Sequence, residues 1–338
     1  MLFVSASPDL DHHDTGPYHP ERPERVIAAL SGIEEAGLTD AVVRLSPRQA
    51  TKEELERVHT RHYLQMVEDF CAGGGGSLDS DTVASHGSWG TALLAAGGAL
   101  AAVDELTSSR EGVAFVAHRP PGHHATADQA MGFCLLNNVA IAAAALLARG
   151  ERVLVLDWDV HHGNGTEAIF WNEPGLFYVS THQSPLYPGT GDARATGGEN
   201  APALTMNIPL PPGATGDVFL YAFDEVVAPA VDEFGPSWVL ISSGFDAHAS
   251  DPLANLELSA GDFADLAARA KSFAPAPGRV VVVLEGGYDL RAISHSAGAV
   301  VAALLGENYR PEPATSGGPG KSVVEHAGQV HRAARQAS

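Results

Sequence analysis

Short runs of apolar, mostly branched residues recur along the chain, and polar residues follow each run closely. Runs that are apolar at every position are typical of strands buried on both faces of a parallel sheet. The clearest begins at Val153 and reads V-L-V-L-D-W-D-V-H-H-G-N-G-T, and the glycines at 163 and 165 are expected to end the strand. The same pattern predicts an edge strand at 2–5 and further strands at 113–117, 176–180, 204–208, 238–242 and 280–284.

Amphipathic or alanine-rich segments lie between these runs and predict helices. Thr51–Glu54 has the capping-box spacing T-x-x-E, and Pro23 with neighbouring acids suits the first turn of a helix that Gly37 ends. Helices are predicted at 26–36, 51–58, 62–70, 89–106, 139–148, 217–234, 259–273, 293–305 and 323–337. Strands that alternate with helices favour an α/β fold with a central parallel sheet and helices on both faces.

No composition break interrupts this alternation before about residue 311. We therefore expect a single domain over residues 1–312. Residues 313–338 are expected to form a Pro/Gly-rich linker and a short C-terminal helix that packs on the domain or trails it.

Three polar features lie outside the predicted elements. The segment Cys71–Asp81 is expected to be an exposed loop, because its four consecutive glycines lack the Gly-Lys-Ser/Thr of a phosphate loop. His12 and His13 are expected to be solvated surface histidines. Arg25 either forms a surface ion pair or points inward.

The 41 acidic residues outnumber the 20 basic ones and give a formal charge of −21. Such a charge repels phosphate backbones, so direct binding of nucleic acid is not expected. It would attract a cationic substrate, although it can also serve solubility alone. Cys71 and Cys134 make no disulfide framework, no signal-peptide pattern opens the chain, and no apolar stretch approaches a membrane helix of about 20 residues. We expect a cytoplasmic protein without a membrane partner.

Acidic and imidazole side chains cluster where the strand that begins at Val153 gives way to glycines. Asp157, Asp159 and His161 occupy alternate positions, so in an extended strand all three would point to one side. Two acids and one imidazole form half of a site for a hard or borderline metal ion. In open α/β sheets, ligands bind just beyond the carboxyl ends of strands.

Three other predicted strands also end in polar groups, namely the pair His123 and His124, Asp246, and Tyr288. In a parallel sheet the carboxyl ends of all strands share one edge, so these groups should converge. Asp159, His161 and Asp246 would leave metal positions open for water and substrate, as catalytic sites do. Tandem histidines can supply a general base and acid, and a tyrosine hydroxyl can stabilise an oxyanion. These parts describe metal-assisted hydrolysis of an amide, without a serine or cysteine nucleophile.

Six motifs spread over about residues 119–289 support this chemistry, and H-P-E-R-P-x-R at 19–25 extends them toward the amino end. They read R-P-P-G-H-H-A, G-F-C-x-x-N-N, D-W-D-V-H-H-G-N-G-T, Y-P-G-T-G, S-G-F-D-A-H-x-x-D-P-L and L-E-G-G-Y. In this order they resemble the zinc-dependent histone deacetylase family, which includes acetylpolyamine amidohydrolases. Asn164 and the D-W-D and E-G-G-Y wording look most like the class II branch and its bacterial relatives, since class I typically has Asp at that position.

The resemblance implies an arginase-like α/β fold and a metal centre. Asp159, His161 and Asp246 would bind Zn²⁺, although this ligand set also suits Fe²⁺. His123 and His124 would be the proton-transfer pair, with His124 as base and then acid during amide cleavage.

The resemblance also assigns supporting roles. Asp157 and Asn164 would orient the two histidines, and Tyr288 would bind the substrate carbonyl and then the oxyanion. A structural potassium ion, K⁺, would be held by Asp157, Ser180 and the backbone of Asp159 and His161.

A narrow substrate tunnel follows from the same resemblance. Phe133 and Tyr187 would wall it around an aliphatic stem, and Gly132 would allow close approach. Leu253 occupies the place where one polyamine-specific branch has an acidic gatekeeper. Arg25 matches an arginine that lines an inner channel for product release.

The expected activity is removal of acyl groups, acetyl above all, from N-acyl-lysine in proteins or peptides by metal-activated water. Deacetylation of acetylpolyamines or another small acylated amine is the alternative. A two-manganese ureohydrolase would need more carboxylate and imidazole ligands than D-x-D-x-H offers. A catalytically silent binding protein would not need the tandem histidines and Tyr288. The oligomeric state is left open.

Overall fold

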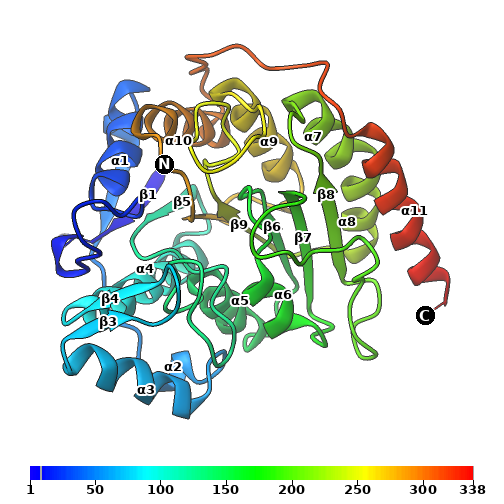
Figure 1. The fold of residues 1–338 in the computed structure, drawn as a ribbon. Coiled ribbons are helices and arrows are strands. Elements are labelled where there is room, and N and C mark those ends of the chain that lie inside the picture. Colours follow the sequence, from blue (N-terminus) through cyan, green and yellow to red (C-terminus); the bar gives the residue numbers. More distant parts are fainter. Residues whose placement is uncertain (8–9, 338) are drawn as a thin grey trace.

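In the computed structural model, which describes residues 1–7 and 10–337, eight strands form one sheet in the order β2-β1-β5-β10-β9-β6-β7-β8 (Figure 1). Every neighbouring pair in it is parallel. The strands are β1 (Leu2–Ala6), β2 (Val42–Leu45), β5 (Val113–Ala117), β6 (Val153–Asp157), β7 (Leu176–Gln183), β8 (Thr205–Leu210), β9 (Trp238–Ser243) and β10 (Val280–Leu284). The predicted α/β fold with a central parallel sheet is confirmed.

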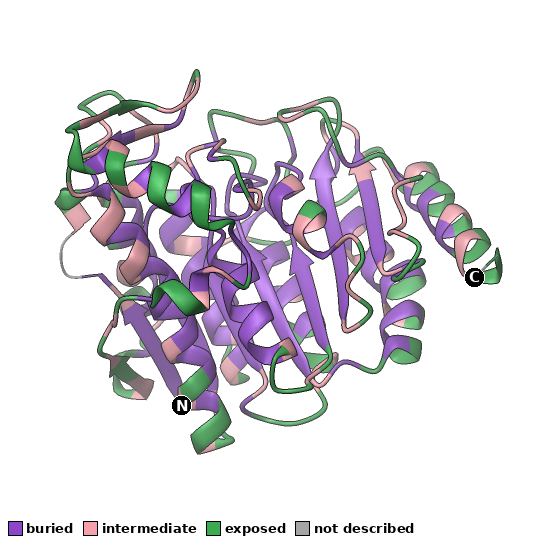
Figure 2. Ribbon diagram, turned by 90° about the horizontal axis from the view of Figure 1, so that it is seen from below, coloured by how far each residue is buried: buried purple, intermediate pink, exposed green. Residues whose placement is uncertain are grey.

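Both faces of the sheet are covered, because successive strand residues point to opposite sides. Figure 2 shows that the strands of the sheet are largely buried. In β6, Leu154 and Leu156 join one core cluster, whereas Val153 and Val155 join the other. The first cluster includes residues of α1 (Glu24–Glu35), α7 (Gly216–Ala222), α8 (Ala228–Phe234), α9 (Ala260–Ser272), α10 (Leu290–Leu305) and α11 (Lys321–Ala337). The second includes residues of α2 (Lys52–Leu55), α3 (Arg61–Ala72), α4 (Ser88–Ser109), α5 (Asn138–Leu147) and α6 (Asn164–Phe170).

Local helix signals act as the sequence predicts. The Thr51 side chain accepts a hydrogen bond from the Glu54 amide in a complete capping box, although α2 ends at Leu55 rather than near residue 58. A second capping box joins Ser259 to Asp262 at the start of α9. The single helix predicted at 217–234 consists of α7 and α8 joined by the π-helical segment Phe223–Val227.

The structure corrects two expectations about strands and one about a loop, and it adds the strand β2. The edge of the sheet is β2, and β1 lies inside, between β2 and β5. The strand β2 has two exposed residues and therefore lacks the all-apolar pattern of the others. Within Cys71–Asp81, residues Gly75–Ser77 form β3, which pairs antiparallel with β4 (Val83–Ser85). The strand β6 ends at Asp157, so Asp159 and His161 lie on the following turn and not on the strand.

His12 is exposed as expected, whereas His13 belongs to a buried ion network. His13 is only 1% exposed and contacts Glu21, so its assignment to the surface was wrong. Arg25 points inward, and its Nη1 lies 3.0 Å from Glu21 Oε1, while Arg119 Nη2 lies 2.7 Å from Glu21 Oε2. Burial alone would raise the pKa of Glu21, but the His13 hydrogen bond and the two guanidinium charges hold it well below its ordinary value.

Replacing Glu21 by alanine is expected to destabilise the fold by about 3–5 kcal/mol, because two buried guanidinium groups lose their counter-charge. Urea unfolding followed by circular dichroism measures this change in the free energy of unfolding. The matched control is Glu24→Ala, which breaks only the exposed pair with Arg22 and should cost less than about 1 kcal/mol. Equal midpoints for the two variants would contradict the prediction.

The C-terminal segment is bound to the body of the protein. Glu312 accepts hydrogen bonds from the backbone of Ala260 and contacts His248, and the Thr315 hydroxyl and amide donate to Asp262. The helix α11 lies against β8 and α7, with Val324 and Ala327 buried in the core. Among the described residues, no helix combines the length and apolarity needed to cross a membrane.

Candidate active site

Four loops converge at one edge of the sheet, because the strands that carry them are adjacent. The order β5-β10-β9-β6 brings together the segments that follow Ala117, Leu284, Ser243 and Asp157. Parallel strands share one carboxyl edge, and the crevice beyond that edge is where α/β proteins bind ligands. The strand order thus places these four segments side by side, as the sequence analysis expected.

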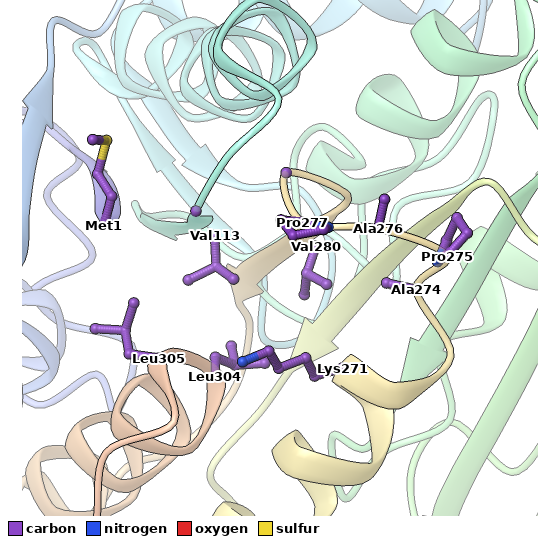
Figure 3. A pocket seen from close by; sticks show the side chains of 12 residues that line it. Met1, Val113, Lys271, Ala274, Pro275, Ala276, Pro277, Val280, Leu304 and Leu305 are labelled. Atoms are coloured by element: carbon purple, nitrogen blue, oxygen red, sulfur yellow. The ribbon is translucent and has the colours of Figure 1, made fainter.

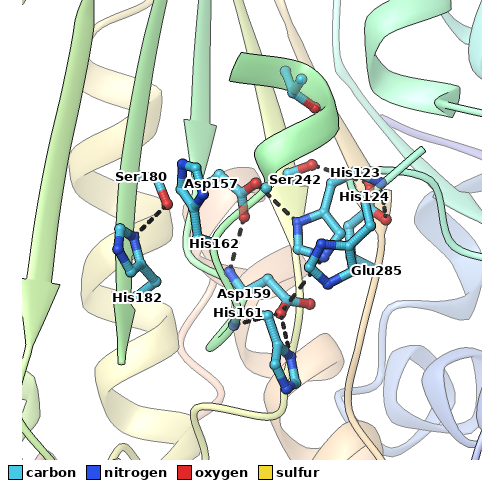
Figure 4. A network of polar contacts seen from close by, with 12 residues as sticks. His123, His124, Asp157, Asp159, His161, His162, Ser180, His182, Ser242 and Glu285 are labelled. Carbon is cyan, nitrogen blue, oxygen red and sulfur yellow. Dashed lines mark hydrogen bonds and ion pairs between the residues drawn. The ribbon is translucent and has the colours of Figure 1, made fainter. Parts of the chain in front are cut away.

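Asp159, His161 and Asp246 form a compact group of candidate metal ligands. One ligand atom from each lies within 4.8 Å of the other two. His161 Nδ1 lies 3.1 Å from Asp159 Oδ1 (Figure 4). The same nitrogen lies 3.2 Å from Asp246 Oδ2. Backbone amides hold the remaining oxygens, since Gly286 donates to Asp159 and Val160 donates to Asp246.

The electrostatics of this group call for a cation. Asp159 and Asp246 are fully buried, and burial together with the charge of Asp159 raises the pKa of Asp246. Burial opposes a charge on His161, yet the hydrogen bonds that its Nδ1 can donate to the two acids, together with their negative charges, raise its pKa to about 10. Two carboxylates and one imidazole nitrogen therefore suit Zn²⁺ or Fe²⁺ in both donor type and charge.

The tandem histidines have different partners. His123 Nδ1 lies 3.0 Å from Asp157 Oδ2 (Figure 4). His124 Nδ1 lies 2.7 Å from Asn164 Oδ1. An amide oxygen only accepts, so His124 carries its proton on Nδ1 when neutral and leaves Nε2 free to take one. The sequence analysis expected Asp157 and Asn164 to orient the two histidines, and the structure shows which one each contacts.

The surroundings of the two histidines shift their pKa values in opposite directions. Burial works against a charge on His123, but Asp159 and Asp157 raise its pKa to about 10. Burial, with the neighbouring His123 and His161, lowers the pKa of His124 well below its ordinary value. A charged and a neutral imidazole with ring centroids 4.0 Å apart can divide the roles of proton donor and acceptor.

Tyr288 follows two glycines, and contacts with Asp251 and Arg25 fix the position of this turn. Its amide donates to Asp251 Oδ2 at 2.7 Å, and the Arg25 guanidinium lies 5.0 Å from the centroid of its ring. Arg25 Nε also donates to the carbonyl of Gly287 at 2.6 Å. A Cβ on Gly286 would come within 2.0 Å of Asp246 Oδ2, so only glycine permits this approach. Burial raises the pKa of Tyr288 well above its usual value and keeps its hydroxyl a donor.

Aromatic rings surround the approach to His124. The Tyr187 ring stands edge-on to His124 at 5.2 Å, and Phe133 lies 5.9 Å from the Tyr288 ring. Gly132 has φ +55°, and a Cβ there would come within 2.3 Å of the His124 ring. Leu253 is 39% exposed, and its amide donates to Asp251 Oδ1.

Asp157 and Ser180, expected to hold potassium, are paired in register on β6 and β7. The Asp157 carboxylate, however, is shared between His123 and the Tyr178 hydroxyl, and Ser180 Oγ lies 2.9 Å from His182 Nδ1. A cation at this place stays a prediction.

The sequence analysis gave no role to Glu285, which is fully buried beneath the tandem histidines. Its carboxylate accepts hydrogen bonds from the amides of Gly122 and His123 at 2.6 and 3.1 Å and from Ser242 Oγ at 3.0 Å. Burial raises its pKa to about 7. Its position could have indicated a role at the site, because Glu285 is an acid that directly follows the wholly apolar strand β10.

A surface hollow of about 430 Å³ lies at the opposite, amino edge of the sheet (Figure 3). It is lined by the first residues of β5 and β10, by Met1, and by Lys271, Leu304 and Leu305 from the ends of α9 and α10. It contains no group of acid and imidazole side chains and is therefore not the candidate active site.

Comparisons with known proteins agree with this geometry. A family model described as "Histone deacetylase domain" matches residues 19–304. A protein of Archaeoglobus fulgidus named "Probable deacetylase" is 41% identical over 315 residues, which cover 89% of this chain and 88% of the relative. The "Histone deacetylase-like amidohydrolase" of Pseudomonas aeruginosa is 40% identical over 293 residues, covering 85% of this chain and 77% of the relative. A solved structure described as "Crystal Structure of HDA15 HD domain" is similar with a TM-score of 0.90 and 35% identity, covering 98% of this chain and 94% of that one.

Proposed function

The chain belongs to the histone deacetylase family and is a hydrolase of amide bonds, and on that premise we propose that it removes acyl groups, chiefly acetyl, from N-acyl-lysine in proteins or peptides. The observation that carries the proposal is the grouping of Asp159, His161 and Asp246 beside a neutral His124. Cys134, the nearest thiol in sequence to the tunnel glycine, is buried, and burial raises its pKa well above the usual value, so it is no nucleophile.

The metal centre we propose uses Asp159, His161 and Asp246 as ligands. A Zn²⁺ ion bound there would polarise the acyl carbonyl and lower the pKa of water, and Fe²⁺ could serve similarly. A structural K⁺ near Asp157 and Ser180 belongs to the same proposal.

The chain's own residues divide the proton transfers. His124 Nε2 takes a proton from the attacking water and then delivers it to the leaving amine, while Asn164 keeps the Nδ1 proton in place. His123, charged and held by Asp157, stabilises the negative charge that develops beside it. The Tyr288 hydroxyl donates to the carbonyl oxygen as it becomes an oxyanion.

The substrate half of the proposal rests on the tunnel walls. The flat rings of Phe133 and Tyr187 suit the methylene stem of a lysine side chain. A small acylated polyamine is the second candidate, and the charge of −21 favours it because it attracts a cation. Leu253 argues the other way, since it offers no carboxylate at the position of an acidic gatekeeper.

Turnover of an acetyl-lysine peptide is therefore expected to exceed that of acetylputrescine and acetylspermidine on the same zinc-loaded protein. The measurement is kcat/KM for each substrate at equal metal content, with a metal-stripped sample as control. Cleavage of the acetylpolyamines alone would contradict the lysine proposal and favour the small-amine alternative. A cytoplasmic location stays a prediction.

A further inference from the structure

The loop that carries Tyr187, residues 184–191, is mostly exposed, and Leu186 packs against the core. Ser184, Tyr187, Gly189 and Thr190 are exposed, and Leu186 is partly buried. Its first residue is tied to β8, since the Ser184 amide donates to the Leu210 carbonyl at 2.8 Å. The Tyr187 oxygen also has a hydrogen bond with the Gly132 backbone, so the position of its ring beside His124 depends on that bond and on what holds the other end of the loop.

Two buried histidines hold that end, and neither has a role in the reaction described above. His162 Nδ1 lies 2.8 Å from Thr190 Oγ1, and His182 Nε2 lies 3.1 Å from the carbonyl of Gly191. Both rings are 1% exposed, and their centroids are 4.9 Å apart (Figure 4). We call His162 and His182 the histidine clamp.

The partners on the far side of each ring settle its proton position. His162 Nε2 faces the carboxylate of Glu167 at 3.2 Å, which only accepts, so in the neutral ring Nδ1 accepts from the Thr190 hydroxyl. The Gly191 carbonyl also only accepts, so His182 donates from Nε2 and receives the Ser180 hydroxyl at Nδ1. Each clamp histidine thus makes one directional bond to the loop and one to the sheet or to α6.

Close packing reinforces these bonds. Gly191 has φ +86°, and a Cβ there would lie 2.4 Å from His182 Nε2 and 2.7 Å from His162 Cγ. The loop backbone therefore rests directly on both rings. Glu167 is held in turn by Asn207 of β8 at 2.5 Å, so the clamp has a fixed base.

We propose that the histidine clamp positions Tyr187 and thereby sets how tightly the tunnel binds the stem of the acylated amine. This inference rests on the proposed function, because it concerns the substrate of the same site. His162 directly follows the candidate ligand His161. The same turn therefore carries a candidate metal ligand and, on the next residue, a histidine that holds the Tyr187 loop. The clamp residues are positioning residues, since they act through Tyr187 and touch no reacting atom.

Thr190→Val and Thr190→Ser form the matched pair that tests the clamp. Both fit an exposed position, but only serine keeps the hydroxyl that donates to His162. In the zinc-loaded protein, Thr190→Val is expected to raise KM for an acetyl-lysine peptide about fivefold, as the loss of one neutral hydrogen bond predicts, with kcat and zinc content unchanged. Thr190→Ser should match the parent, and so should Ser184→Ala on the same loop.

A double-mutant cycle shows whether the effect passes through Tyr187. Tyr187→Ala alone should raise KM about tenfold, because it removes one aromatic wall. Adding Thr190→Val to it should change KM by less than about twofold, since the clamp then has no ring to position. Multiplying effects, or a fall in kcat instead of a rise in KM, would overturn the inference.

Hydrogen exchange of the loop amides separates this inference from the function it rests on. Residues 184–191 should exchange faster in Thr190→Val than in Thr190→Ser, whether or not any acylated amine is hydrolysed. Equal exchange in the two variants would overturn the clamp. Faster exchange in a protein that hydrolyses no acylated amine would support the clamp's hold on the loop and contradict the proposed function.

Discussion

Asp246→Ala is expected to lose the metal ion and the activity together. The substitution removes one of the three candidate ligands and leaves Asp159 and His161, which cannot close a stable site for Zn²⁺ alone. Metal activation contributes several kcal/mol to such reactions, so kcat/KM should fall by about three orders of magnitude or more. Zinc per chain, measured by mass spectrometry after gel filtration, should fall from about one toward zero.

The control for this variant is Asp40→Ala, which removes an exposed carboxylate far from the site in sequence and should keep both zinc and turnover. Circular dichroism of the Asp246 variant should show an intact fold, since the loss relieves a contact between two buried carboxylates. Full zinc occupancy in Asp246→Ala would refute its assignment as a ligand.

Tyr288→Phe is expected to lower kcat by about 10²–10³ while zinc content stays the same, because a single preorganised donor to an oxyanion contributes that much. The ring should remain in place, since Arg25 lies over its face and the Tyr288 backbone amide bonds to Asp251. Only the hydroxyl is lost, so KM should change little.

Tyr309→Phe is the matched control, because it removes a phenol hydroxyl from a partly exposed tyrosine outside the candidate site. Its kcat should equal that of the parent protein. If Tyr288→Phe also kept its kcat, Tyr288 would have no place in the mechanism.

The regular elements followed from local patterns. The all-apolar runs at β5, β6, β9 and β10 predicted strands buried on both faces, and all four lie in the interior of the sheet. The capping box at Thr51 predicted the start of α2. These signals succeed because burial on both sides and unsatisfied helix amides constrain residue type directly.

The edge strand and the buried charged residues could not be predicted from such local patterns. The strand β2 is half exposed, so its composition resembles that of a loop and it was not predicted. The edge position was therefore assigned wrongly to β1. His13 looked like a surface residue because histidine occurs both in water and in cores. Its burial depends on Glu21, which is close in sequence, and on Arg119, which comes from a distant part of the chain and donates to the His13 carbonyl.

The sequence by itself determined the chemistry available to this protein: the motifs that supply two acids and a histidine, a tandem histidine and a tyrosine, each next to a strand that its apolar run predicts. Tertiary structure decided how these groups are used. It made Asp157 the partner of His123, placed Glu285 under the tandem histidines, and set His162 and His182 against the Tyr187 loop. The reason is physical. Residue type and spacing limit what a side chain can donate or accept, but hydrogen bonds and charge pairing act only over a few ångströms. His182 and Gly191 are close in sequence, but the other partners named here are separated by 28 to 162 positions. Only the packing of the sheet brings them within hydrogen-bonding distance.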